Sequence, residues 1–565
     1  MSTEKRRKQP RSRSIGSERS RAWSTCTTDS PGDAGYASLS TSRRAHLMRE
    51  NQPRIAERQT ERHSVLKKIL RGAGTDAIKY FPVRLVPALT SFITVPVFTR
   101  IIDRADYGDF YLVSSTISLA SMLLTAWLTA SIVRFYWAEE REGRLNQYIA
   151  TVVWASLASL IVGAAVLGGI LLLFGGGLSE GVRHLIPIAL ASLIFNQFIQ
   201  VMQQLMRAAN RANDYAILSV ASAILSTVFS VYFVAVSHWG SYGILAGVVA
   251  GNLILLPLAL KNARMEGSIS PKNFSPSITK QFAAYGIPMI PAAISSWVLI
   301  LSDRYIIGLS QSADQVGLYG TAYNLGDKIM NLVTLPLLIA IGPVMVHTFE
   351  KEGQKLAEKV QTQLTRYFAM ATVPLVFGLA VVSKPFMTVF TGPEYRSAYA
   401  VLPVVAAGVM LYGVSQIASN GLAMHKKTVI MMQNTFIAAV FQVAMNLLLV
   451  PRFGYAAAAW NTFGAYLLLL VLMWFRSRPY MEWTVPWADM ARIFGAGAIM
   501  AGVLSAAFRR FDAALWLLGA EVIVGIAAYF LALWALRGLR PDEMEFIGEM
   551  WTAIRRKLHL GGRAA

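Results

Sequence analysis

The sequence predicts an all-α polytopic membrane protein with about fourteen transmembrane helices, and three observations support that prediction. Hydrophobic residues make up 54% of the 565-residue chain and charged residues only 15%, a balance that excludes an ordinary soluble protein. Apolar stretches of about 20 residues recur, each long enough to cross the roughly 30 Å hydrocarbon core as a helix. Similar motifs also return at a spacing of about 210 residues, which indicates an internal repeat.

The apolar stretches divide into two groups of six and a final pair. The predicted spans are residues 79–101, 107–136, 147–174, 183–206, 214–236, 241–260, 282–307, 314–345, 366–383, 397–424, 428–450, 454–475, 488–508 and 513–536. The first six form an N-terminal lobe, residues 77–260, and the next six form a C-terminal lobe, residues 282–475. A cytoplasmic linker, 261–281, joins the lobes. Residues 487–536 hold two accessory helices, and a basic cytoplasmic tail, 537–565, follows.

The net charge of +21 is better explained by membrane orientation than by a nucleic-acid partner. If the N-terminus is cytoplasmic, the inner loops hold about twice as many Lys and Arg as the outer loops, as the positive-inside rule requires. The inner set is Arg141, Arg144, Arg207, Arg211, Lys261, Arg264, Lys272, Lys280, Lys351, Lys355, Lys359, Arg366, Lys426, Lys427, Arg476 and Arg478. We therefore expect a multi-pass protein of the cell (inner or plasma) membrane with both termini in the cytoplasm.

Residues 1–76 differ from the rest, with 17 Lys and Arg against 8 Asp and Glu and almost no apolar periodicity. We expect a disordered cytoplasmic tail, or a start codon assigned too early, with Met48 as the alternative start. No apolar core of a cleavable signal peptide is evident near the start. The single cysteine, Cys26, lies here, which excludes disulfides within the chain and cysteine metal sites.

The sequence lacks the common motifs of catalysis and cofactor binding. It has no G-x-x-x-x-G-K-[ST] phosphate loop and no H-E-x-x-H, and its seven His are scattered. We therefore expect a transporter with no cofactor and no metal site, and no enzyme activity. Such a transporter would draw on an ion gradient, the membrane potential or a substrate gradient.

The two halves of the chain carry matching motifs in the same order. Gly108, in DYGDFYLV at the start of the second span, matches Gly317, in QVGLYGTA at the start of the eighth. YGILAGVVAGNLILL likewise matches YAAAAWNTFGAYLLLL. Six spans separate the members of each pair, and an even number preserves orientation. The sequence thus predicts two six-helix lobes related by a pseudo-twofold axis along the membrane normal.

The same segments resemble a known family. AYGIPMIPAAISSWVLILSDRYIIG followed by SADQVGLYGTAYNL is similar to the central signature of the bacterial polysaccharide-export (oligosaccharide) flippases of the multidrug/oligosaccharidyl-lipid/polysaccharide exporter superfamily. TVPVFTRIIDRADYGDFYLVSS resembles that family's first helix pair, and LVPRFGYAAAAWNTFGAY its eleventh and twelfth helices. The resemblance covers roughly residues 77–480. It implies two lobes facing a central cavity, and movement of a lipid-linked oligosaccharide from the cytoplasmic to the outer leaflet.

That substrate class suggests a mechanism of alternating access. A polyprenyl diphosphate sugar combines a lipid tail, a dianionic linker and a hydroxyl-rich head that cannot cross hydrocarbon unaided. The product would serve O-antigen, capsule or exopolysaccharide export, with a polysaccharide polymerase and glycosyltransferases as further partners. An inside-negative potential of about 100 mV would push a dianion outward by about 4–5 kcal/mol, at about 2.3 kcal/mol per charge.

The stretch TAYNLGDKIMN places polar side chains inside an apolar span. Asn324, Asp327, Lys328 and Asn331 follow helical spacing of three and four residues, so they lie on one helix face. Asp327 and Lys328 come about ten to fifteen residues into the span, near mid-bilayer at about 1.5 Å per residue. Charges at that depth face a protein interior or a wet cavity. Two interpretations stay open: polar contacts between helices, and a surface that binds substrate.

Other spans supply candidate partners for this face. Arg84 lies just inside the cytoplasmic boundary of the first span, where it either snorkels to the interface or contacts substrate. Gln200 and Gln203 share a face of the fourth span, where such residues equally serve as contacts between helices. Asp303 and Arg304 lie near the outer end of the seventh span and form a local ion pair or, as the resemblance implies, a gating or head-group site. The candidates for ion coupling are Asp327 and Asp303.

The two lobes are unequal in polarity. Aligning the two matched glycines places Ser118 and Leu119 where the second lobe has Asp327 and Lys328.

Two other functions stay open. A multidrug cation antiporter of the same superfamily would share the architecture but should have a more acidic cavity. A membrane-embedded glycan polymerase or glycosyltransferase would need a sizeable catalytic loop with carboxylates, and the loops between spans look too short for one.

Overall fold

The computed structural model describes residues 85–87, 89–509, 511, 513–540 and 543. Contacts divide the chain into two units, Met1–Lys68 and Ile69–Ala565, and every described residue belongs to the second. The predicted tail of residues 1–76 lies outside the described residues. So do Arg84 and nearly all of the C-terminal segment beyond residue 540.

In the described part of the chain, all regular structure is helical, and every predicted span falls on a helix. Thirteen helices are long and apolar enough to cross a membrane, and a shorter apolar helix, Leu85–Ile101, precedes them. The first group of helices is α2 Arg104–Arg141, α3 Leu145–Phe174, α4 Glu180–Ala208, α5 Ala212–Ala235 and α6 Gly240–Glu266. The helices that follow are α7 Pro276–Gly286, α8 Ile290–Ser310, α9 Ala313–Glu352, α10 Gln354–Phe390, α11 Val401–Ala418, α12 Asn420–Met424, α13 Thr428–Phe453, α14 Tyr455–Ser477, α15 Trp487–Phe508 and α16 Leu515–Ala535. The predicted fold class is confirmed.

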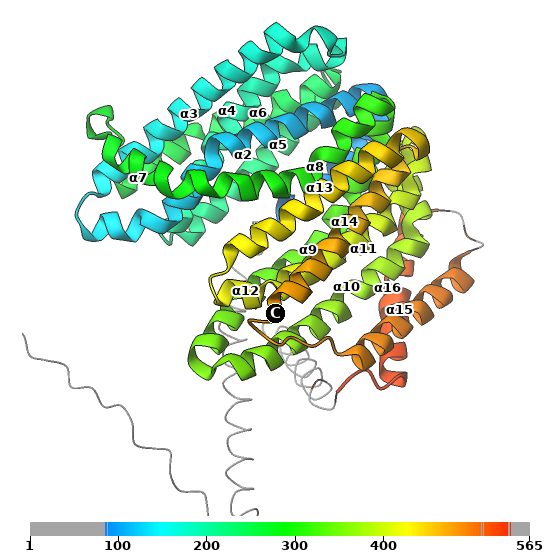
Figure 1. The fold of residues 1–565 in the computed structure, drawn as a ribbon. Coiled ribbons are helices and arrows are strands. Elements are labelled where there is room, and N and C mark those ends of the chain that lie inside the picture. Colours follow the sequence, from blue (N-terminus) through cyan, green and yellow to red (C-terminus); the bar gives the residue numbers. More distant parts are fainter. Residues whose placement is uncertain (1–84, 88, 510, 512, 541–542, 544–565) are drawn as a thin grey trace, which may run out of the picture. The chain divides into compact units, whose positions relative to one another are not determined.

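The long helices pack in two groups with the same internal order (Figure 1). In the first group, α2 packs on α4, α4 on α6, and α5 on α6. In the second, α9 packs on α11, α11 on α14, and α13 on α14. The helices that correspond in chain order thus have corresponding neighbours, as a parallel repeat requires. The residue boundaries given above for the lobes and the linker stay a prediction.

The segment α7–α8 connects the two groups. α7 packs on α2, where Ser131 donates a hydrogen bond to the Phe282 carbonyl (3.0 Å). Gly286 makes this contact close, because a Cβ there would lie 2.1 Å from the carbonyl oxygen of Trp127. α8 then packs on both α2 and α13. A side chain at residue 286 would therefore push the α7 segment away from the first group.

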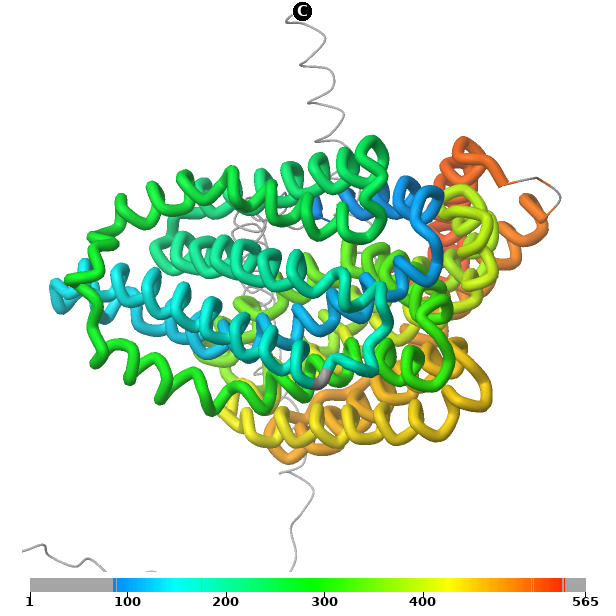
Figure 2. The backbone as a smooth tube through the Cα atoms, turned by 90° about the horizontal axis from the view of Figure 1, so that it is seen from above, coloured from blue at the N-terminus to red at the C-terminus, as the bar shows by residue number. Residues whose placement is uncertain are grey.

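α15 and α16 pack on each other and on α10, at the edge of the second group (Figure 2). Arg366, which the sequence places among loop charges, is instead buried within α10. Its guanidinium pairs with Asp489 of α15 (3.1 Å) and with Glu543. Burial raises the pKa of Glu543, but hydrogen bonds from Arg366 and from the Arg540 amide outweigh this and lower it. These carboxylates compensate a cation that would be costly to bury alone.

The two groups cross where the repeat-related glycines meet. A Cβ on Gly108 would lie 1.9 Å from the carbonyl oxygen of Ala313, and a Cβ on Gly317 would lie 2.3 Å from that of Arg104. The contact is reciprocal, since each glycine meets the residue four positions before the other. Such reciprocity is expected where α2 and α9 cross on a twofold axis. We call the end of the molecule that holds this crossing the Gly108 end.

Candidate functional site

Further bonds join the two groups at the Gly108 end. They run from the end of helix Leu85–Ile101 and the residues after it to the end of α10 and the 3-10 segment Pro393–Ala400. Arg100 donates to the Val389 carbonyl (2.8 Å), the Gly392 amide to Thr99 Oγ1 (3.0 Å), and the Tyr395 hydroxyl to the Ile102 carbonyl (3.2 Å). Tyr395 is fully buried at this contact between the two groups. The structure is therefore closed at the Gly108 end.

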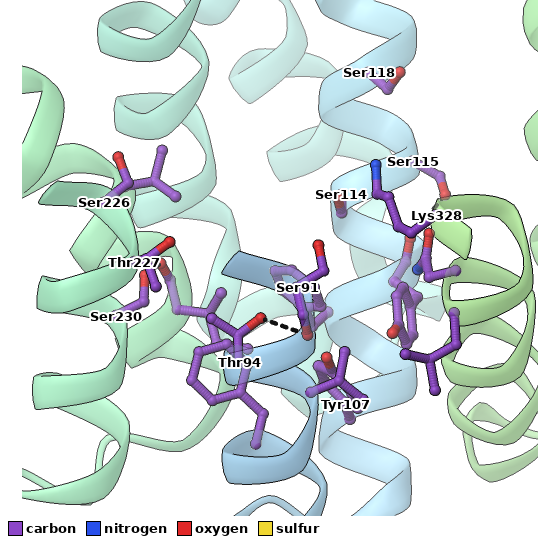
Figure 3. Close-up of a pocket in the computed structure, with 18 of the residues that line it drawn as sticks. Ser91, Thr94, Tyr107, Ser114, Ser115, Ser118, Ser226, Thr227, Ser230 and Lys328 are labelled. Carbon is purple, nitrogen blue, oxygen red and sulfur yellow. Dashed lines mark hydrogen bonds between the residues drawn. The ribbon is translucent and has the colours of Figure 1, made fainter. Parts of the chain in front are cut away.

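A cavity of about 410 Å³ lies between the groups, beside this closure. One wall comes from helix Leu85–Ile101, α2, α5 and α6, and the other from α8 and α9. Figure 3 shows hydroxyl side chains of the first wall on several helices, with Lys328 facing them from α9. A concave site with convergent polar groups is the usual form of a ligand-binding site.

The first wall consists largely of hydroxyls. Eight Ser and Thr side chains line it: Ser91, Thr94, Ser114, Ser115, Ser118, Ser226, Thr227 and Ser230. Some are bonded within the protein, as when Ser115 donates to the Tyr111 carbonyl (2.8 Å) and Ser230 to the Ile244 carbonyl (2.8 Å). Within the described part of the chain, four have no such partner: Ser114, Ser118, Ser226 and Thr227. These hydroxyls can donate to and accept from a ligand.

The opposite wall supplies cationic and amide groups. Asn324 and Lys328, one helical turn apart on one face of α9, both line the cavity. No carboxylate of the described residues lies within ion-pair distance of the Lys328 ammonium, although Asp327 is its neighbour in sequence. Neither Asn324 nor Lys328 has a hydrogen-bond partner among the described side chains. Lys328 is therefore a cation available to an anionic ligand.

Arg304 of α8 also lines the cavity, but its charge is compensated. Its guanidinium lies 3.3 Å from Asp303 Oδ1, donates to the Ile300 carbonyl at 3.2 Å, and stacks 4.9 Å from the centre of the Tyr323 ring. Asp303 accepts further hydrogen bonds from the Tyr319 hydroxyl and from the Arg304 amide. Asp303 and Arg304 are both almost fully buried. They thus form the local ion pair that the sequence suggested. The cation of this pair, Arg304, lies at the cavity wall.

The other polar residues of the α9 stripe have partners along their own helix. Asn331 donates to Asp327 (2.8 Å), and Thr334 donates to Asn331 (3.0 Å). Asp327 and Asn331 are not among the residues that line the cavity. The stripe therefore divides into two parts, one facing the cavity and one held by bonds within the helix.

The two predicted residues of α4 are not brought to the cavity. Gln200 is exposed on α4 and Gln203 is half-buried, and neither lines the cavity. Arg84 lies outside the described residues.

The second group also holds a set of buried polar side chains, and two of them, Gln442 and Asn446, share one face of α13 in the sequence. Asn461 of α14 donates to Asn446 of α13 (2.9 Å), and Gln442 donates to Thr462 (3.2 Å). All four side chains are buried. Gln442 Oε1 and Asn446 Nδ2 have no partner among the described atoms. The polar i, i+4 spacing on α13 was a signal for this cluster, because buried amides in apolar helices usually pair across helices.

Comparisons with known proteins agree with this architecture. Residues 74–349 match the family model described as "Polysaccharide biosynthesis protein". The chain is 21% identical over 438 residues to the probable low-salt glycan biosynthesis flippase Agl15 of Haloferax volcanii, covering 76% of this chain and 88% of that protein.

Solved structures with the same fold include two kinds of transporter. The lipid II flippase MurJ, in an inward closed conformation, aligns with a TM-score of 0.64 at 16% identity, over 80% of this chain and 97% of that one. A MATE family multidrug resistance transporter, in an inward-facing conformation, aligns with a TM-score of 0.56 at 16% identity, over 71% and 94% of the two chains. The chain is thus a multi-pass membrane protein with the fold of these transporters, and residues 74–349 are similar in sequence to the polysaccharide biosynthesis proteins.

Proposed function

We propose that this protein flips a polyprenyl-diphosphate-linked oligosaccharide from the cytoplasmic to the outer leaflet by alternating access. The observation that carries the proposal is the cavity itself. It combines the unpaired Lys328 with eight Ser and Thr hydroxyls, and no Asp or Glu is among its lining residues. A diphosphate requires a cation, and sugars require hydroxyl and amide partners. Both requirements are met within one cavity.

The same chemistry argues against a cation antiporter. The MATE-like fold is shared by both classes, so the fold does not distinguish them. A cationic drug about 4 Å from the Lys328 ammonium would be repelled by about 4 kcal/mol at an effective dielectric of about 20. A cavity without a lining carboxylate has no group to offset that repulsion. The oligosaccharide substrate is therefore the better fit.

The direction of transport rests on the proposed orientation. We place the Gly108 end outside and the basic loops in the cytoplasm, following the positive-inside rule. The closure at Gly108 and Gly317 then seals the cavity from the outside, as in an inward-facing or occluded step of the cycle. Reporter fusions after Ser237 and Ala313 should read as outside, and fusions near Asn273 and Gly353 as inside. A reversed pattern would overturn the direction.

Asp303 is the better supported of the two ion-coupling candidates. Its partner Arg304 reaches the cavity wall, so an anionic head group would compete with Asp303 for the guanidinium. A carboxylate that loses its cation in a buried site gains affinity for a proton or a metal cation. Asp327 instead accepts a hydrogen bond from Asn331 and does not line the cavity.

The test is flipping by the full chain in proteoliposomes. A polyprenyl-diphosphate oligosaccharide with a fluorescent sugar should change leaflets, and faster under an inside-negative potential because the head is dianionic. A lipophilic cation in the same vesicles should be neither transported nor inhibitory. Proton-coupled transport of the cation without flipping of the lipid would support the antiporter instead.

A further inference from the structure

A second hollow, of about 480 Å³, lies against the other side of α2, in its Gly108-end half. α2, α3, α4 and α8 all contribute to it, and most of its lining is aliphatic. Representative residues are Leu112, Val113, Leu171, Leu190, Leu193 and Leu309. Leu309, at its rim, is 89% exposed, and an aliphatic side chain so exposed in a membrane-spanning helix faces lipid. We call this space the aliphatic hollow.

The polar groups of the aliphatic hollow are bonded to one another. Ser179 Oγ lies 3.0 Å from Asp109 Oδ1, to which it donates a hydrogen bond. The hydroxyls of Thr116 and Tyr305 are 2.7 Å apart. Apart from the second oxygen of the Asp109 carboxylate, what remains for a ligand is mainly apolar surface, and an apolar surface favours hydrocarbon over water or polar groups.

The aliphatic hollow and the cavity lie at one depth on opposite sides of a seam between α2 and α8. On α2, Ser114 and Ser115 line the cavity, whereas Thr116 lines the hollow. On α8, Arg304 lines the cavity and the next residue, Tyr305, lines the hollow. The hydrogen bond between Thr116 and Tyr305 closes the seam between them.

We propose that the aliphatic hollow binds the polyprenyl chain of the transported lipid, and that the α2–α8 seam is where the chain passes laterally into the bilayer. This inference rests on the proposed function, because it assigns the two parts of one amphipathic substrate to two adjacent spaces. A head enclosed between the two groups cannot take a long isoprenoid chain in with it. The chain has to leave sideways, and the α2–α8 seam has a polar cavity on one side and an apolar hollow on the other.

Photolabelling of the full chain in proteoliposomes tests this assignment. One sample receives a polyprenyl-diphosphate sugar with a diazirine in the isoprenoid chain, and the other a phospholipid with a diazirine in its acyl chain. Leu171 lines the hollow, while its neighbour Leu172 is 83% exposed. The isoprenoid should label Leu171 several-fold more than Leu172, and the phospholipid should show the opposite preference. Isoprenoid labelling that follows exposure, as the phospholipid does, would overturn the proposal.

A filled hollow gives a second readout. Ala189→Phe places a ring in the hollow from a buried position on α4, and Leu172→Phe is the lipid-facing control. Ala189→Phe should lower isoprenoid labelling of Leu171 at least fivefold, and binding of a short-chain diphosphate sugar should be unchanged. If the variant does not fold, the wild-type labelling pattern alone decides. If the lipid is flipped but labelling follows exposure, the hollow is not the binding site of the isoprenoid chain, and the proposed function stands. If labelling is confined to the hollow but the lipid is not flipped, the hollow binds isoprenoid chains and the proposed function fails.

Discussion

The two walls of the cavity come from repeats with the same packing but carry different chemistry. Ser118 lines the cavity, although its repeat equivalent Asp327 does not. Lys328 lines it, although its equivalent Leu119 does not. The first wall thus presents neutral hydroxyls and the second wall presents cations. The repeat therefore sets the frame of the cavity, and the two halves line it with different chemistry. Under the proposed function, the hydroxyls would bind the sugars and the cations would bind the diphosphate.

The largest effect is expected at the crossing of α2 and α9, where the two halves of the molecule are in contact. Gly108→Ala adds a Cβ at a point 1.9 Å from the Ala313 carbonyl oxygen. Overpacking of this kind costs about 1–3 kcal/mol, which is about a fivefold to hundredfold shift away from the closed state. In a Cys26→Ser background, Ile102→Cys should then become accessible to a membrane-impermeant thiol reagent.

Gly342→Ala on α9 is the matched control, because a Cβ there meets nothing within 4 Å. It should leave labelling unchanged and stabilise the helix by about 0.5–1 kcal/mol. Equal labelling of Ile102→Cys in both glycine variants would show that the crossing does not hold the two halves closed.

The next largest effect should come from removing the free cation of the second wall. Lys328→Gln should slow flipping of a diphosphate-linked sugar about tenfold to hundredfold, since hydrogen bonds to charged groups contribute about 1.5–3 kcal/mol. Lys328→Arg should keep most of the activity, because it keeps the charge. Lys384→Gln, an exposed lysine on α10, is the control. If Lys328→Gln flips as fast as Lys328→Arg, the cation has no role in binding. Arg84→Gln tests the remaining predicted cation in the same assay.

Ion coupling should distinguish the two candidate carboxylates, Asp303 and Asp327. Asp303→Asn leaves the buried Arg304 without its carboxylate, so we expect lower stability together with loss of the gradient dependence of flipping. Asp327→Asn keeps an oxygen that can accept from Asn331, and flipping should still respond to the gradient. The comparison is made in proteoliposomes with and without an imposed pH or sodium gradient. Gradient dependence that survives in Asp303→Asn but not in Asp327→Asn would reverse the assignment.

The smallest effects belong to single hydroxyls of the first wall. Ser118→Ala or Thr227→Val removes one neutral hydrogen bond of about 0.5–1.5 kcal/mol, which should slow flipping about twofold to tenfold. Ser156→Ala is the control, since its hydroxyl is buried in α3 and bonded to the Val153 carbonyl. The double variant with Ser118→Ala and Thr227→Val should slow flipping more than either single variant. Flipping that is slowed by Ser156→Ala but not by Ser118→Ala would remove the first wall from sugar recognition.

The sequence predicted the helices and part of the second wall. Apolar length alone located the spans, and helical spacing placed Asn324 and Lys328 on a cavity-facing surface. Helical spacing could not separate Asp327 from them, because bonds along a helix leave no trace in the spacing. The first wall gave no signal, since Ser and Thr in apolar helices commonly bond their own backbone. Arg366 was misplaced because its partners, Asp489 and Glu543, lie more than 100 residues away in sequence.

The central claim is that Lys328 recognises the diphosphate of the substrate, and a comparison of two lipids tests it most directly. The same oligosaccharide is attached to a polyprenyl chain through either a diphosphate or a monophosphate, and flipping of each is measured for wild-type protein and Lys328→Gln. We predict that the wild type prefers the diphosphate and that Lys328→Gln loses most of this preference, because the second phosphate no longer meets a free cation. An unchanged preference in the variant, with both lipids slowed equally, would contradict the account.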